Sequence, residues 1–331
     1  MEKWEGAGDI THSMRYLRKN ARAESSSAVS VVNALSTGKG STIAINLRCE
    51  VETQVMSYSK DKSFGQVLGG WRVAVNSQDK DHHALVLTCI DRALKFMSRV
   101  KSLRLPSGES KLLRIRIRSE IPPACGLKSS SAVSTAVVSS IFRTFLKGEP
   151  DSKDVLDVSC KASIDAGASI TGAYDDASAC LLGGLVLTDN AKFTLLEHRQ
   201  VPESLGNIVL LLVPPRIRRK FTSSVDQSAY ANFRSQSAEA FHYALKGDLP
   251  QAIFLNSVVQ SLALKYSIRP VVDAILEGST ASGISGKGPA MFAFCQSEKS
   301  ARRITSSWQE DRRNLRMQII KTHVVQPKRG H

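Results

Sequence analysis

Residues 121–133 read IPPACGLKSSSAV, and this short stretch decides what we expect of the whole chain. It follows KLLRIRIRSE (111–120), whose strict alternation predicts a strand with one buried face. A proline-stiffened turn and a glycine then lead into residues 129–146, which have the pattern of a helix. The first N–H groups of a helix have no partners within it and carry partial positive charge. Glycine and small serines at such a turn would let a phosphate approach the backbone closely.

The same stretch also has an ordinary structural interpretation. Serine is a favoured residue at helix N-termini, and prolines commonly precede helices. Against this, Lys128 adds a full positive charge, and the serine hydroxyls can contact phosphate oxygens or a magnesium ion. For a loose turn of glycine and serine alone, the structural interpretation is the better one. More of the sequence is needed to choose between the two.

Length and composition narrow the class of protein. The chain has 331 residues, 42% of them hydrophobic and 23% charged, which corresponds to about two domains. Such a composition excludes collagen-like, fibrous and disordered acidic proteins. No apolar run approaches the ~18 residues of a membrane helix, and the N-terminus lacks the apolar core of a secretory signal. We therefore expect a cytoplasmic protein without a membrane partner. Its six cysteines lie far apart, which predicts reduced, buried thiols rather than a zinc site or disulfides.

The chain is strongly basic. Its 45 Lys and Arg against 30 Asp and Glu give a net charge of +15, with clusters at residues 216–220 and 302–329. A nucleic acid, an anionic small substrate and plain solvation of the surface are three possible reasons. Aromatic residues make up only 6% of the chain, and no nucleic-acid-binding motif accompanies the charge. We therefore expect no nucleic-acid partner.

The pattern along the chain predicts an N-terminal extension over residues 1–26 and two domains, 27–200 and 201–331. Alternating strands flank the turn Thr37-Gly38-Lys39-Gly40, and strands and helices then interleave without a regular β-α repeat. This favours a two-domain α+β fold over a doubly wound sheet. The adjacent His82 and His83 are expected on a helix surface rather than as metal ligands. Further helices are expected at residues 80–99, 154–166, 226–245 and 271–277, and a final strand at 290–295.

Three segments in order resemble the motifs of the GHMP small-molecule kinases. They are P-x-x-x-G-L-x-S-S-S-A from Pro122, GAYDDASACLLGG (172–184) and GISGKGPAMFAFC (283–295). The finer resemblance, carried also by NALSTGKGSTIAINL (33–47) and GASITGAYDDAS (167–178), is to the archaeal-type shikimate kinases. It extends from about residue 28 to the C-terminal region, and Cys125 stands where relatives usually have a small polar residue. No P-loop of the G-x-x-x-x-G-K-[ST] type occurs in the chain.

This resemblance implies a two-domain GHMP-kinase fold of the α+β class. Its N-terminal domain would be mixed α/β, with the phosphate loop between a strand and a helix, and its C-terminal domain would be ferredoxin-like. The implied activity is transfer of the γ-phosphoryl group of ATP to the 3-hydroxyl of shikimate, with Mg²⁺. A homoserine or mevalonate kinase, a non-catalytic ATP-binding sensor and a nucleic-acid binder are the alternatives.

The resemblance also implies roles for single residues. Spacing from Gly183 favours Asp176 over its neighbour Asp175 as the base, and an Asx turn is the other interpretation of the pair. Asp165 matches an acidic magnesium ligand about as well as it matches a solvated helix end, and Ser130 matches a metal-contacting serine. The expected nucleotide contacts are Pro122, Pro123, Ala124, Cys125, Gly126, Leu127, Lys128, Ser129, Ser130, Ser131 and Ala132. The expected substrate contacts are Asn33, Thr37, Lys39, Ser41, Gly286 and Gly288.

Overall fold

The computed structural model describes residues 18–57, 65–77, 82–99, 108–215, 228–311, 314 and 316–327. Within these residues the first sheet has seven strands, in the order β3-β4-β5-β2-β6-β7 with β1 paired to β2. Only β4 and β5 run parallel in this sheet, and α1 connects them. The strands are β1 (Asn20–Val32), β2 (Lys39–Ser57), β3 (Gln66–Leu68), β4 (Trp71–Ser77), β5 (Gly108–Ser119), β6 (Leu185–Asp189) and β7 (Thr194–Arg199).

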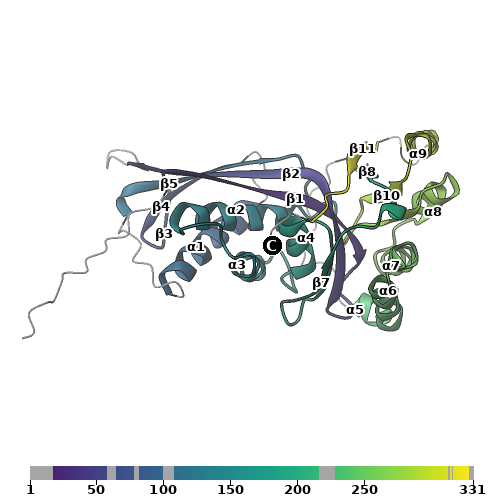
Figure 1. The fold of residues 1–331 in the computed structure, drawn as a ribbon, viewed down its shortest axis with the longest axis horizontal. Coiled ribbons are helices and arrows are strands. Elements are labelled where there is room, and N and C mark those ends of the chain that lie inside the picture. The colour runs from purple at the N-terminus through teal and green to yellow at the C-terminus, as the bar shows by residue number, and fades with distance from the viewer. Residues whose placement is uncertain are drawn as a thin grey trace, which may run out of the picture.

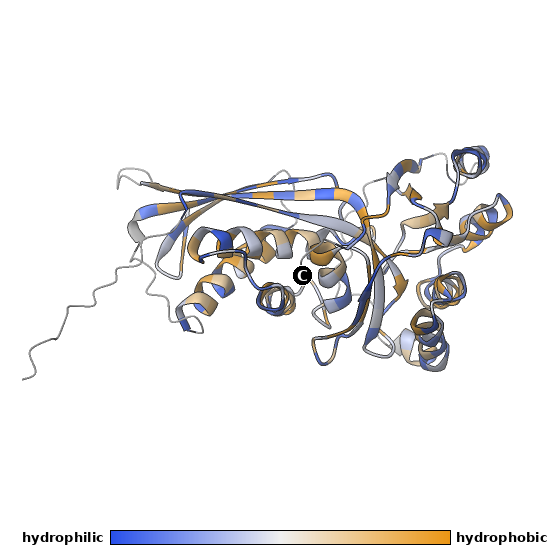
Figure 2. Cartoon of the chain, viewed as in Figure 1, coloured by the Kyte–Doolittle hydropathy of each residue, from blue (hydrophilic) through white to orange (hydrophobic). Residues whose placement is uncertain are grey.

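Helices cover one face of this sheet (Figure 1). They are α1 (His83–Arg99), α2 (Ser129–Phe145), α3 (Ser152–Asp165) and α4 (Tyr174–Leu182). Helix α2 is buried along almost its whole length because it packs against the strands and against its three neighbours. In Figure 2 it is accordingly coloured mostly as hydrophobic. This packing holds α2 in place, and it also holds α4, which packs against α2.

The second sheet lies at the other end of the molecule (Figure 1). In the described residues it is antiparallel, in the order β11-β8-β10-β9. Its strands are β8 (Ile208–Val213), β9 (Ala281–Ile284), β10 (Met291–Cys295) and β11 (Gln318–His323). Its helices are α5 (Ser228–Ala231), α6 (Arg234–Lys246), α7 (Leu249–Leu264), α8 (Arg269–Leu276) and α9 (Glu298–Glu310). The expected division after residue 200 falls in the connection between β7 and β8, where the chain passes from one sheet to the other.

The C-terminal segment returns to the first sheet. Val324 bridges to Ile45, and the N–H of Gly184 donates to the carbonyl of Val325 at 2.8 Å. A Cβ atom on Gly183 would lie 2.5 Å from the carbonyl oxygen of Gln326. The Gly-Gly pair that follows α4 is therefore needed for this close approach, and the segment secures the end of the helix that carries Asp175 and Asp176.

The predicted N-terminal extension is wrong over residues 20–26. These residues form the first half of β1 and pair with Gln54–Arg48 of β2. The polar composition of this stretch misled the prediction, because Ser25 and Ser26 are buried rather than exposed. The hydroxyl of Ser25 lies 2.8 Å from that of Thr135 in α2. Residues 1–17 lie outside the described residues.

Other predictions of secondary structure were confirmed in part. The helices near 83–99, 129–145, 152–165 and 269–276 are present, whereas the one expected over 226–245 is two helices, α5 and α6. The strand at 291–295 is not the final one, since β11 follows it. Helices α4, α7 and α9 were not predicted. All six cysteines lie in the described part of the chain and are buried free thiols, as expected. None of the helices in the described residues combines the length and the apolar character that crossing a membrane needs.

Candidate active site

A turn between β5 and α2 builds the first part of the site. Ala124, Gly126 and Lys128 have positive φ angles of 59°, 94° and 62°, so the chain is tightly curled before α2 begins. Lys128 is the N-cap residue, and among the described residues no side chain caps the helix there. The first N–H groups of α2 are thus without a side-chain acceptor, which is the geometry of an anion site. The expected nucleotide contacts, residues 122–132, form this turn and the start of α2.

The glycine-rich turn at residues 285–288 packs directly on the first turn. The hydroxyl of Ser285 donates to the carbonyl of Gly126 at 2.8 Å, and the N–H of Ala290 donates to the carbonyl of Cys125 at 2.9 Å. A Cβ atom on Gly126 would lie 2.1 Å from the carbonyl oxygen of Ser285. We expected a glycine at this position to admit a phosphate. The structure shows instead that Gly126 admits the backbone of the second domain.

Asp176, in the first turn of α4, reaches the turn between β5 and α2, residues 122–128, which we call the phosphate turn after its expected ligand. Its Oδ1 atom lies 2.9 Å from Nζ of Lys128, and 5% and 18% of the side chains of Lys128 and Asp176 are exposed. The ammonium also donates to the hydroxyl of Ser30 in β1, at 2.7 Å. Thr42 of β2 donates to both aspartates at 3.3 Å. Strands β1 and β2, the phosphate turn and α4 therefore meet at one ion pair.

Asp175 lies deeper than Asp176, and its residue is only 4% exposed. Oδ1 accepts from Nδ2 of Asn190 at 2.7 Å, and the N–H of Asp175 donates to Oδ1 of Asn190 at 3.1 Å. Burial, and next the negative charge of Asp176, raise the pKa of Asp175, while Lys128 and the Asn190 hydrogen bond act in the opposite direction. A Cβ atom on Gly40 would lie 2.3 Å from Oδ2 of Asp175, so this glycine near the start of β2 makes room for the carboxyl.

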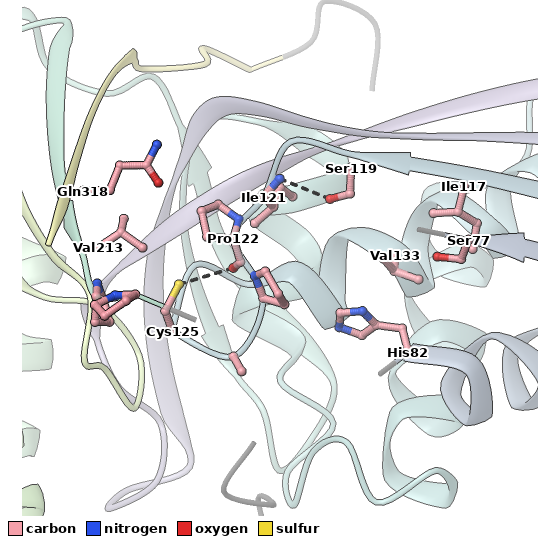
Figure 3. Close-up of a pocket in the computed structure, with 14 residues that line it drawn as sticks. Ser77, His82, Ile117, Ser119, Ile121, Pro122, Cys125, Val133, Val213 and Gln318 are labelled. Atoms are coloured by element: carbon pink, nitrogen blue, oxygen red, sulfur yellow. Dashed lines mark hydrogen bonds between the residues drawn. The ribbon is translucent and has the colours of Figure 1, made fainter. Parts of the chain in front are cut away.

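A cavity of about 300 Å³ opens beside the phosphate turn (Figure 3). Pro122 and Cys125 lie between its two ends, with His82 towards α1 on one side and Val213 of β8 on the other. His82 is buried, and its Nε2 atom lies 3.4 Å from the hydroxyl of Ser129. The volume is at the lower end of the range for small-molecule sites. Contrary to the expectation of a surface histidine pair, only His83 is exposed.

Comparison with known proteins shows to which family the chain belongs. Residues 88–184 match the GHMP kinases N terminal domain, and residues 240–314 match the GHMP kinases C terminal domain. A shikimate kinase of Pyrococcus furiosus is 34% identical over 285 residues, which cover 86% of this chain and 94% of that protein. The chain belongs to the GHMP kinases. It is an ATP-dependent small-molecule kinase with the two-domain fold of that family.

Other proteins similar to this GHMP kinase support the same family and fold. A shikimate kinase of Thermococcus kodakarensis is 35% identical over 82% of this chain and 91% of its own length. Among solved structures, a homoserine kinase from Cytophaga hutchinsonii superposes with a TM-score of 0.66 at 17% identity, covering 95% of this chain and 97% of that one. The mevalonate kinase of Methanococcus jannaschii gives a TM-score of 0.67 at 14% identity, covering 94% and 99%. At such identities the two structures show the fold alone.

The residues that we expected to hold substrate do not all face the aspartates. Thr42 points at them, and successive side chains of a strand point to opposite faces, so its neighbour Ser41 points away. Ser41 is fully buried, and its hydroxyl has no hydrogen-bond partner among the described residues. Asn33 accepts from the N–H of Leu35, and Thr37 from that of Lys39, so both side chains shape the hairpin turn. The role of Ser41 in substrate binding is thus without support.

The three other expected substrate contacts are Lys39, Gly286 and Gly288. Lys39 is exposed at the start of β2, and its Nζ lies 5.8 Å from the centre of the Phe241 ring. Gly286 and Gly288 belong to the turn that packs on the phosphate turn, and a Cβ atom on Gly286 would lie 2.9 Å from Nζ of Lys128. These glycines allow two parts of the protein to approach each other. The basic cluster at 216–220 lies outside the described residues.

The two expected metal ligands differ in their surroundings. Ser130 lies in the first turn of α2 and is partly exposed, and no side-chain partner is recorded for it among the described residues. Asp165 lies at the end of α3 and forms a partly exposed ion pair with Arg92 of α1, which lowers its pKa. The described residues contain no cluster of three His, Cys, Asp or Glu that could hold a metal. Magnesium often takes one or two carboxylates together with substrate phosphates, so Asp165 is the residue of the two that offers such a ligand, and the hydroxyl of Ser130 would add one more oxygen. Asp165 would have to leave Arg92.

Sequence reasoning missed four residues of the site. Ser30, Thr42 and Asn190 surround the two aspartates, and His82 lines the cavity. Ser30 and Thr42 carry no signal of their own, because small polar residues in strands are common. Asn190 follows β6 at the end of the segment that begins with the Asp-Asp pair, which is a weak hint at most. Only the packing of β1, β2 and β6 against α4 brings Ser30, Thr42 and Asn190 together.

Proposed function

We propose that this GHMP kinase phosphorylates the 3-hydroxyl of shikimate with ATP, giving shikimate 3-phosphate and ADP. The observation that carries the proposal is the Lys128–Asp176 pair beside the uncapped start of α2. It puts a carboxylate that can take a proton next to a site for phosphate. Shikimate as the acceptor is supported by the relatives from Pyrococcus furiosus and Thermococcus kodakarensis, which are both shikimate kinases.

In this proposal the two aspartates have different tasks. Asp176 is partly exposed and takes the proton of the acceptor hydroxyl, whereas Asp175 is buried and held by Asn190. Asp175 orients the start of α4 through its backbone and side-chain hydrogen bonds. Phosphoryl transfer depends mainly on positioning and on neutralisation of charge, and the N-terminus of α2 contributes to both.

Nucleotide and metal would be held on the same side of the site. The cavity beside Pro122 and His82 would hold the nucleoside, and the first turn of α2 the phosphates. Ser130 would contribute a hydroxyl to Mg²⁺, and Asp165 a carboxylate once released from Arg92. The ion, when bound, neutralises phosphate charge. The exposed ammonium of Lys39 offers a partner for the carboxylate of shikimate. The proposed location is the cytoplasm, where ATP is available.

Measurement of ADP release with a panel of alcohols tests the substrate. Purified protein, ATP and Mg²⁺ are combined with shikimate, homoserine or mevalonate at equal concentrations, and the phosphorylated product is identified by ³¹P NMR. We expect shikimate to be preferred by at least about 10²-fold in kcat/KM, because a site built to pair with several polar groups rejects acceptors that lack them. Preference for homoserine or mevalonate would overturn the shikimate assignment. ATP binding without turnover of any acceptor would instead favour a non-catalytic sensor.

A further inference from the structure

Ser30 of β1 connects the second domain to the ion pair of the candidate active site. Its hydroxyl accepts one hydrogen bond from Nζ of Lys128, at 2.7 Å, and another from the N–H of Gly286, at 3.1 Å. A hydroxyl oxygen has two lone pairs, so these two donors use its whole capacity to accept. The residue is only 1% exposed, and water is therefore not at hand to replace either donor. One oxygen atom thus joins the lysine of the phosphate turn to the turn at residues 285–288.

The turn at 285–288 is itself fixed by hydrogen bonds. The N–H of Ser285 donates to the carbonyl of Ala290 at 3.0 Å, and the N–H of Gly288 donates to the carbonyl of Ser285 at 2.8 Å. The hydroxyl of Ser285 donates to the carbonyl of Gly126 at 2.8 Å and accepts from the N–H of Ser30 at 3.4 Å. Strand β1 and the phosphate turn are therefore both bound to this turn, and Ser30 is bound to it through its backbone as well as its hydroxyl.

The ammonium of Lys128 is confined on three sides. It lies 2.9 Å from Oδ1 of Asp176 and 2.7 Å from the hydroxyl of Ser30, and a Cβ atom on Gly286 would lie 2.9 Å from it. A lysine is a flexible stem with a point charge at its end, so its partners decide where the charge lies. Without the hydroxyl of Ser30, Asp176 would be the one partner recorded for this ammonium among the described residues. The two charged side chains could then turn together.

We propose that Ser30 is a positioning residue, through which the turn at 285–288 aligns Lys128 with Asp176. The inference rests on the proposed function, in which Asp176 takes the proton of the acceptor hydroxyl. A base has to lie within hydrogen-bond distance of the proton that it takes, and a displacement of about 1 Å can cost about 10²-fold in rate. Ser30 acts on the direction of this carboxylate, because its hydroxyl fixes the ammonium with which the carboxylate pairs.

Loss of the Ser30 hydroxyl should lower turnover more than substrate binding. Ser25→Ala is the matched control, because Ser25 lies in the same strand, is also 1% exposed and has its hydroxyl paired with Thr135 rather than with a lysine. We expect Ser30→Ala to lower kcat by about 10–10²-fold and to change the KM for ATP and for the preferred alcohol less than about threefold. Ser25→Ala should keep kcat within about twofold. A Ser30→Ala enzyme with a kcat within about threefold of the wild type, or an equal loss in Ser25→Ala, would refute the role of Ser30.

A double variant shows whether Ser30 acts through the lysine. In a Lys128→Met background, Ser30→Ala should change the residual kcat less than about threefold, because no ammonium is left to be positioned. If Ser30→Ala lowered kcat by the same factor in both backgrounds, Ser30 would act independently of Lys128, and the proposal would be wrong.

Gly286→Ala reaches the same ammonium from the turn without removing a hydrogen bond. Its Cβ would press on Nζ of Lys128, the mobile end of a long side chain, so we expect the lysine to move rather than the fold. Gly247→Ala is the control, since its φ is also positive and its Cβ would meet nothing within 4 Å. Gly286→Ala should lower kcat by at least about 10-fold and Gly247→Ala by less than about twofold. Equal kcat values would contradict the proposal, and this comparison decides the matter even if Ser30→Ala does not fold.

The ammonium of Lys128 can also be followed without any substrate. A buried ammonium exchanges its protons slowly enough to give a ¹H–¹⁵N NMR signal, and the loss of that signal in Lys128→Met assigns it. In the protein without nucleotide or alcohol, we expect the signal to shift in Ser30→Ala and to stay unchanged in Ser25→Ala. An unchanged signal in Ser30→Ala would refute the positioning. Because no acceptor is present, failure of the shikimate assay leaves this result standing and overturns only the proposed acceptor.

Discussion

The ammonium of Lys128, in the phosphate turn, lies 2.9 Å from Oδ1 of Asp176, in the first turn of α4. These residues are far apart in the sequence, and the two motifs that contain them are joined by this contact. The pair fixes the separation between the proposed phosphate site and the proposed base. It therefore offers a direct way to test how the two motifs depend on each other.

Removal of the Lys128 charge should cost stability through Asp176. We expect Lys128→Met to lower the free energy of unfolding by about 3 kcal/mol, near the lower limit for a buried pair because Asp176 is partly exposed. In an Asp176→Asn background the same change should cost much less, because no unpaired charge is left. Urea unfolding of both single variants and the double variant measures the coupling. Lys95→Met, in the exposed pair with Asp91, is the control and should cost under about 1 kcal/mol. If the losses of unfolding free energy in Lys128→Met and Asp176→Asn simply added in the double variant, the two charges would not stabilise each other.

Loss of the proposed base should reduce turnover while leaving ATP binding nearly unchanged. Asp176→Asn keeps the size of the side chain but cannot accept a proton, so kcat should fall by about 10²–10⁴-fold. Asp175→Asn should cost less, because its role is to hold the start of α4 with Asn190. Steady-state kinetics of both variants decide the order. A nearly active Asp176→Asn beside an inactive Asp175→Asn would move the base to Asp175.

Gly126 should tolerate no side chain, for reasons of packing between the two domains. Gly126→Ala puts a Cβ atom 2.1 Å from the carbonyl oxygen of Ser285, at a φ of 94°. Gly148→Ala is the matched control, because its φ is also positive but its Cβ would meet nothing within 4 Å. We expect Gly148→Ala to cost about 1 kcal/mol of stability and Gly126→Ala at least about 2 kcal/mol more. Thermal unfolding and the KM for ATP measure the effect, and equal costs would show that the turn at 285–288 yields freely.

The stability of the protein should depend on pH through Asp175. Burial raises the pKa of its carboxyl in the folded state, so the unfolded chain releases this proton first as the pH rises. Through this group, the free energy of unfolding of the wild type therefore falls as the pH rises from the ordinary carboxyl pKa of about 4 to the raised folded pKa. It is not regained at higher pH. Asp175→Asn has no such titration, so its stability relative to the wild type should improve from pH 4 to pH 7. Urea titrations at both pH values test this, and a constant difference would exclude the effect.

Deletions at the N-terminus should distinguish the contribution of residues 1–17 from that of β1. A chain that begins at residue 18 keeps the whole of β1 and the hydrogen bond from the N–H of Arg18 to Thr144. Its activity should stay within a few-fold of the full chain. Deletion through residue 26 removes the pairing with Arg48–Gln54 and should lower the melting temperature by at least about 10 °C. Equal melting temperatures for the two truncations would show that the first half of β1 adds little.

The local structure around the phosphate turn could be predicted well from the sequence. Alternation in KLLRIRIRSE, the prolines and the serines correctly placed β5, the turn and α2. Predictions failed where polar residues are buried. The serines at 25–27 suggested the end of an exposed extension but lie buried in β1, where Thr135 of α2 and the carbonyl of Leu127 pair with the hydroxyls of Ser25 and Ser27. Such satisfaction depends on a partner distant in the chain, so no local pattern reveals it.

The order of three motifs in the sequence by itself determined the family and the kind of reaction, and it predicts which segment holds the phosphates. Only the tertiary structure decided which residues act together. It moved Lys128 from the phosphates to Asp176, turned Ser41 away from Thr42 and gave Gly126 a role in packing against Ser285. The physical reason is that a motif records the residue types that a turn needs, whereas charge pairing and close approach depend on segments that meet only in the folded chain.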